Sequence, residues 1–152
     1  MKKIISFFII STLSLVLGGC VNTVHYPDNA VEKDKLAFLD TISKGDDHIT
    51  ILRINGKASG DWWNGPVGDH YVKYGKIQIK VQYHNNTENY VAYTSLTFNT
   101  VAGKTYKVSS SVDYDEDEVT ISVTENGKVL TKKTVSLIIQ EIPIMIPIII
   151  MI

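Results

Sequence analysis

The chain of 152 residues carries 15 Lys and Arg against 16 Asp and Glu, and it contains a single cysteine. This balance provides no basic surface for phosphate groups, so a nucleic-acid partner is not expected. A single cysteine leaves no internal disulfide, and the length suits one domain with an ordinary hydrophobic core.

The first twenty residues have the features of a lipoprotein signal peptide. Lys2 and Lys3 precede an uncharged run from residue 4 to residue 17, and the run ends in LGGC at Cys20. A basic start, a short apolar stretch and small residues before a cleavage point are typical of a secretory signal. The ending resembles the bacterial lipobox, where a peptidase cuts before a cysteine that carries lipid. A membrane span, the alternative, needs about 20 apolar residues and fits less well.

The expected location of the chain follows from this signal peptide. Removal of residues 1–19 takes away two lysines and leaves 13 basic against 16 acidic residues. Val21, directly after Cys20, is not the acidic residue that retains lipoproteins in the inner membrane of enteric bacteria. We therefore expect a lipid-anchored protein of the bacterial envelope, attached through Cys20 to the outer membrane and facing the periplasm.

Residues 20–35 read as a lipidated tether. The segment VNTVHYPDNAVEKDK, residues 21–35, is polar and has no hydrophobic periodicity. Such a composition is typical of a linker between an anchor and a folded domain. The alternative is that part of this segment packs as an edge strand.

The segment KIQIKVQYH, residues 76–84, is the clearest predicted strand. Apolar side chains alternate strictly with polar ones, so one face of the strand is expected to be buried and the other to face water. The inward set is Ile77, Ile79, Val81 and Tyr83, and the outward set is Lys76, Gln78, Lys80 and Gln82.

Further strands are predicted at spacings near ten residues. They cover residues 36–42, 48–54, 90–98, 105–112, 119–123 and 128–137. The segment 48–54 is apolar on both faces, which indicates a central position in its sheet. Asn-Gly pairs at residues 55–56 and 126–127 favour type I′ hairpin turns. Together these signals predict an all-β domain over residues 36–139: one antiparallel sandwich of about seven or eight strands, transthyretin- or immunoglobulin-like in general layout.

The last residues, 140–152, form an apolar tail of low complexity. Pro143 and Pro147 interrupt it, which disfavours both a membrane span and a central strand. Three interpretations stay open: a terminal strand near residues 135–139 followed by a loose end, a second membrane contact, or a non-native ending from a shifted reading frame.

A tryptophan pair marks the candidate binding loop. Asp61, Trp62, Trp63 and Asn64 lie between Gly60 and Gly65. An exposed tryptophan beside polar neighbours can stack on a sugar ring or anchor a partner protein. The alternative is that both indoles cap one end of the core.

Metal and cofactor chemistry finds little support in the residue pattern. The four histidines are scattered without the close spacing of zinc ligands. The acidic run between Asp113 and Glu118 lacks the EF-hand spacing and is expected to be a solvated hairpin loop. No cofactor and no metal are therefore expected.

Catalytic motifs are also lacking. No Gly-x-Ser-x-Gly motif occurs, and no Ser/His/Asp arrangement is evident. Carboxylate pairs for glycoside hydrolysis remain conceivable among Asp46, Asp47, Asp61 and Asp69, but their separation is not fixed by sequence. A non-enzymatic structural or binding module is the leading hypothesis, with an envelope protein or glycan as its partner. The alternative is a small periplasmic hydrolase that acts on envelope glycan or peptide.

Three phrases resemble a group of small bacterial envelope lipoproteins of unknown function. They are INGK at residues 54–57, the strand of residues 75–83, and AGKTYKV at residues 102–108. In that group similar phrases form a hairpin turn, an alternating strand after a turn, and a turn that enters a tyrosine-containing core strand. The resemblance covers roughly residues 36–125 and departs at residues 74–76, which lack the group's proline and histidine. It implies a β-sandwich-like lipoprotein and supplies no catalytic residues.

Overall fold

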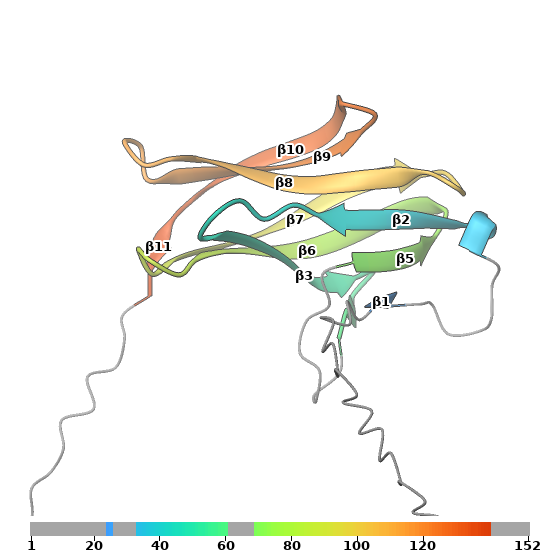
Figure 1. Cartoon of the computed structure of the whole chain (residues 1–152), viewed down its shortest axis with the longest axis horizontal. Helices are drawn as coiled ribbons and strands as arrows, with labels where there is room; N and C mark the ends of the chain where they lie inside the picture. Colours follow the sequence, from blue (N-terminus) through green and yellow to red (C-terminus); the bar gives the residue numbers. More distant parts are fainter. Residues whose placement is uncertain (1–23, 26–32, 61–68, 141–152) are drawn as a thin grey trace, which may run out of the picture.

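The computed structural model describes residues 24–25, 33–60 and 69–140, which form a sandwich of two β-sheets (Figure 1). Cys20, the loop of residues 61–64 and the tail beyond Gln140 lie outside the described residues. The first sheet has the order β1-β5-β2-β8-β9-β10, and the second has the order β11-β7-β6-β3-β4. The predicted all-β sandwich is therefore confirmed.

The described residues hold eight strands of five residues or more, and three strands of two residues. The longer strands are β2 (Leu36–Thr41), β3 (Asp47–Ile54), β5 (Asp69–Lys73), β6 (Gly75–Asn85), β7 (Tyr90–Thr100), β8 (Thr105–Asp113), β9 (Glu118–Glu125) and β10 (Lys128–Ser136). The short ones are β1 (Val24–His25), β4 (Lys57–Ala58) and β11 (Ile138–Ile139), and a 3-10 turn, η1 (Lys33–Lys35), precedes β2.

The hairpin of β6 and β7 is the backbone of the second sheet. Its register runs from the pair Gly75 and Thr100 to the pair Asn85 and Tyr90. All four apolar residues predicted to face inward on β6 are buried. On the opposite face Gln82 is half-buried and the three other predicted outward residues are exposed. The period-two pattern of β6 therefore reports its burial correctly.

Strand β3 departs from the expected central position. It lies between β6 and the short β4, and it pairs with β4 only through Arg53 and Ile54. Its mixed pattern has a local cause, because the register with β6 shifts between Ile51 and Arg53. A bulge of this kind breaks the strict alternation of side chains between faces.

Among the described strands, two pairings are parallel, both in the first sheet, and the others are antiparallel. β2 runs parallel to β8, and β1 runs parallel to β5. The pairing of Val24 with Asp69 and of His25 with His70 places β1 at the edge of the first sheet. Two residues of the segment expected as a tether therefore join the sheet.

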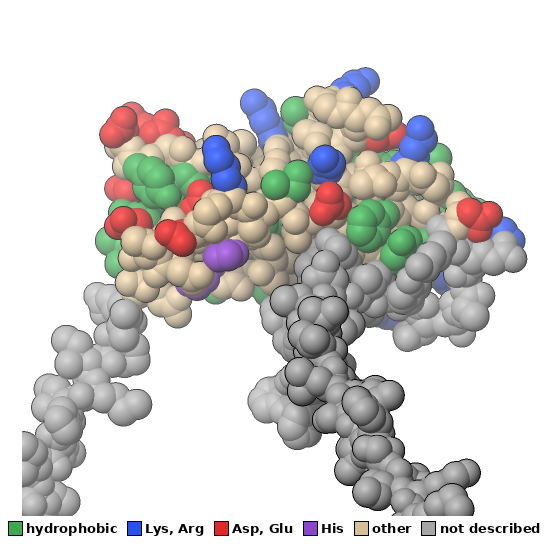
Figure 2. Space-filling model, in the orientation of Figure 1, with side chains coloured by type: hydrophobic (Ala, Val, Ile, Leu, Met, Phe, Trp, Pro, Cys, Tyr) green, Lys and Arg blue, Asp and Glu red, His purple; other side chains and the backbone are tan. Residues whose placement is uncertain are grey.

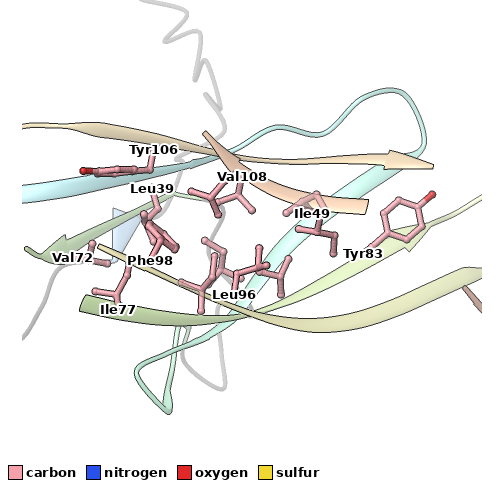
Figure 3. Close-up of a cluster of buried hydrophobic side chains, with 14 of the residues drawn as sticks. Leu39, Ile49, Val72, Ile77, Tyr83, Leu96, Phe98, Tyr106 and Val108 are labelled. Atoms are coloured by element: carbon pink, nitrogen blue, oxygen red, sulfur yellow. The ribbon is translucent and has the colours of Figure 1, made fainter. Parts of the chain in front are cut away.

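The core fills the space between the two sheets and ends in a tyrosine on each side (Figure 3). Tyr83 and Tyr106 are both fully buried. The Tyr106 hydroxyl accepts a hydrogen bond of 2.8 Å from the Val101 amide, and the Tyr83 hydroxyl points out of the other end of the cluster. Each buried hydroxyl thus reaches a polar partner where the core meets the loops.

Three loops meet at the Tyr83 end of the sandwich, drawn at the left of Figure 1: β2–β3, β6–β7 and β8–β9. The chain also changes sheet here. After β10, Leu137 is buried and its amide donates to the Asp117 carbonyl over 2.7 Å, and β11 then pairs with the start of β7. This arrangement, which we call the loop end, holds the site described next.

Candidate functional site

A pocket of about 480 Å³ opens at the loop end. It is lined by residues from all three loops: Asp46, Asn85, Thr87, Glu88, Tyr90 and Tyr114. Loops presented by a rigid sandwich are the usual place for a binding site, because they vary without disturbing the core.

Asn85 is the hub that shapes the pocket. Its amide Nδ2 donates to Asp47 Oδ1 over 2.8 Å and to the Tyr114 hydroxyl over 3.3 Å. Its Oδ1 accepts the backbone amides of Thr87 and Glu88, over 2.9 and 2.8 Å. One buried side chain therefore fixes the β6–β7 turn, the start of β3 and the β8–β9 loop relative to one another.

Asp47 connects Asn85 to Tyr83 next to the pocket. The Tyr83 hydroxyl donates to Asp47 Oδ1 over 2.5 Å, and the same oxygen accepts from Asn85. Burial raises the pKa of the Tyr83 hydroxyl, and the hydrogen bond to Asp47 raises it further. Tyr83 is therefore a proton donor throughout the neutral range, and Asp47 is held by two donors.

Asp46 joins the β2–β3 loop to the β6–β7 turn. Its Oδ2 accepts from the Thr87 hydroxyl over 2.7 Å, and its carbonyl accepts from the Asn86 amide over 3.3 Å. Across the pocket the rings of Tyr90 and Tyr114 lie 6.1 Å apart between centroids and are tilted by 41°. The pocket thus combines two aromatic rings with the carboxylates of Asp46 and Glu88, and the Asp46 carboxylate is held by Thr87.

The pocket is acidic. Asp46 and Glu88 line it, and among the described residues no lysine or arginine does. The exposed acidic run at residues 113–118 lies in the adjoining β8–β9 connection, and Figure 2 shows Asp and Glu side chains gathered over this end. A group that carries positive charge meets a favourable field here, and one that carries negative charge does not.

The predicted site residues fall in different places. The acidic run forms the expected exposed loop between two antiparallel strands. Of the carboxylates considered for hydrolysis, Asp46 lines the pocket and Asp47 lies in the network below it. Cys20 and the four residues from Asp61 to Asn64 are outside the described residues and stay predictions. Within the described ranges, no three His, Cys, Asp or Glu side chains are placed to hold a metal ion.

Nothing in the sequence marks the residues of this hydrogen-bond network as a binding site. Asn85 and Asn86 mark a turn, and Tyr83 reads as the last inward residue of a strand. The network depends on contacts between residues 36 to 38 positions apart, such as Asp47 with Tyr83 and Asn85. The one weak indication was the run of amide and hydroxyl side chains, Asn85, Asn86 and Thr87, at the end of a strongly alternating strand.

Comparisons with family models, curated proteins and solved structures give no match to this chain. Among the described residues, no helix is long and apolar enough to cross a bilayer.

Proposed function

We propose that this protein is a lipid-anchored binding module of the bacterial envelope that recognises a positively charged group of its partner at the loop end. The proposal is carried by the pocket lined by Asp46, Glu88, Tyr90 and Tyr114. Carboxylates attract an ammonium or guanidinium group, and the faces of tyrosine rings attract the same cations.

The architecture supports a binding role for this pocket. Asn85 and Asp47 hold the three loops together by side-chain hydrogen bonds, so the pocket exists before a ligand arrives. Preorganised loops lose less conformational freedom when a ligand binds. A cationic group on an envelope protein or on an amino-sugar glycan fits this chemistry.

A pair of matched peptides tests the pocket. Tetralysine is titrated into the full chain by calorimetry, and the same peptide with acetylated lysines serves as the control, because acetylation removes the charge. Binding of the first peptide alone is expected. Glu88→Gln and Asp46→Asn should each weaken it by roughly two- to fivefold, the range of exposed charge pairs.

Glu125→Gln is the matched control variant for these changes. Glu125 lies at the far end of β9, where its carboxylate is 3.7 Å from the Lys104 ammonium. Its loss changes the net charge by the same amount and should leave peptide binding unchanged. Equal weakening by all three variants would assign the effect to net charge and remove the pocket from the proposal.

The anchor is proposed on the sequence of residues 1–20 alone, with lipid on Cys20 and attachment to the outer membrane. Cys20→Ser is expected to move the protein from the membrane pellet to the soluble periplasmic fraction. If the variant still sediments with the membrane, the lipid anchor is not on Cys20.

The hydrolase is the second candidate, because Asp46 and Glu88 lie in one pocket. A pair of carboxylates is what glycoside hydrolysis requires. Purified envelope glycan and its peptides are incubated with the protein, and new reducing ends or free amines are measured. If the protein cleaves either substrate and both Asp46→Asn and Glu88→Gln abolish the cleavage, the protein is a hydrolase and the binding-module proposal is wrong.

A further inference from the structure

Two histidines that are 36 positions apart in sequence face each other across β3 and β6. His48 pairs directly with His84 in the antiparallel register. The adjoining row is the pair Ile49 and Tyr83, whose side chains point into the core, so the two imidazoles stand together on the outer face of the second sheet. Both histidines are half-buried.

Directly opposed residues in an antiparallel pair have Cβ atoms about 4.5 to 5.5 Å apart. This spacing lets two imidazoles reach one metal ion from adjacent strands. No hydrogen bond or ion pair to either imidazole occurs within the described part of the chain, so their nitrogens are not committed to a protein partner. Histidine surface is visible beside the acidic end of the molecule in Figure 2.

The structure assigns to His48 and His84 a two-histidine binding site for a divalent transition metal, with Cu²⁺ as the tightest ligand. Imidazole nitrogen suits copper, nickel and zinc, and affinity along this series is highest for copper. Two nitrogens from the protein leave the other coordination positions of the ion to water or to a group of a partner. The imidazoles lie on the outer face of β3 and β6, whereas Asn85 of the pocket lies on the inner face, and the site is independent of the proposed function.

Strand pairing supplies the rigidity that such a small site needs. The register continues on both sides of the histidine row, with Asp47 opposite Asn85 and Thr50 opposite Gln82. The backbones therefore stay in place whether or not metal is bound. Two-point attachment on a fixed frame strengthens binding by on the order of 100-fold or more over a single imidazole.

The test is a titration of the full chain, carrying Cys20→Ser so that no thiol competes, with CuCl₂ in a calorimeter. We expect one Cu²⁺ per chain, with an electron paramagnetic resonance spectrum that shows two nitrogen ligands. His48→Ala and His84→Ala should each weaken binding by about 100-fold and reduce the spectrum to one nitrogen.

Thr50→Ala and Gln82→Ala remove the next pair on the same face and should leave copper affinity unchanged. Melting temperature is measured for every variant, and His48→Gln and His84→Gln replace any alanine variant that fails to fold. The site is overturned if a folded variant of either histidine binds Cu²⁺ within threefold of the parent, or if the spectrum keeps two nitrogens.

Discussion

Tyr83 and Asp47 are joined by a hydrogen bond of 2.5 Å between the tyrosine hydroxyl and Asp47 Oδ1, although they are 36 positions apart in sequence. Tyr83 is the last apolar residue of the inward row of β6 and is fully buried, whereas Asp47 begins β3 at the rim of the sandwich. The bond therefore connects the hydrophobic core to Asp47, which also accepts a hydrogen bond from Asn85 in the pocket lining.

Tyr83→Phe removes this bond and keeps the ring. We expect the variant to lose about 2 kcal/mol of folding free energy, because a hydrogen bond to a charged group contributes about 1.5–3 kcal/mol. Urea denaturation measures it. Tyr93→Phe is the control, since Tyr93 is exposed on the outer face of β7. Equal stability of Tyr83→Phe and the parent would show that the bond contributes nothing.

The raised pKa of Tyr83 also makes the free energy of unfolding depend on pH in the alkaline range. Its folded pKa is raised, whereas the unfolded chain has a tyrosine pKa of about 10. Above that pH the unfolded chain loses the Tyr83 proton first, so this contribution is complete below pH 10 and declines as pH rises. The slope is up to about 1.4 kcal/mol per pH unit. Denaturation series between pH 8 and 11 should show a shallower decline for Tyr83→Phe, and identical slopes would contradict this assignment.

Asn85→Ala tests the hub of the pocket. The change leaves two backbone amides and one carboxylate oxygen without this partner. The expected loss is about 1–2 kcal/mol, because partly buried polar groups lose a hydrogen-bond partner. Asn86→Ala is the matched control at the adjacent, exposed position. The two variants should also differ in tetralysine binding: Asn85→Ala should weaken it, and Asn86→Ala should leave it unchanged. Similar effects of both variants would show that the turn, and not the hub, sets stability.

The sandwich could be predicted from the sequence because its signals are local. The alternation from Ile77 to Tyr83 reports one buried face, and the Asn-Gly turns adopt positive φ at both residues: 48° at Asn126 and 79° at Gly127. These conformations are the ones that Asn and Gly tolerate. Each of these signals depends on a few adjacent residues, so it can be recognised without knowing which strand is the partner.

The site could not be predicted because it depends on register between distant strands. The pairing of β3 with β6 brings Asp47 beside Asn85 and His48 beside His84, and no spacing in the sequence encodes it. Strand β5 was also missed, because DHYVK is short and directly follows a segment of sequence rich in Gly and Trp. Parallel pairing of β2 with β8 likewise joins segments that are more than 60 residues apart.

Replacing Thr94, a buried residue between the sheets, is expected to raise the free energy of unfolding. It lies on the inward face of β7 opposite Val81, it is 6% exposed, and its hydroxyl has no hydrogen-bond partner within the described residues. A buried hydroxyl without a partner destabilises the folded state, because it has lost its water. Valine has nearly the same shape and no hydroxyl.

Thr94→Val is therefore expected to stabilise the protein by about 1 kcal/mol, the lower part of the range for an unsatisfied buried group. Thr97→Val, on the exposed face of the same strand, is the matched control, because both changes gain the same strand preference. Urea denaturation of the two variants should place Thr94→Val above Thr97→Val. A loss of stability in Thr94→Val alone would mean that the hydroxyl holds a buried water, and the core would then contain a solvated polar site.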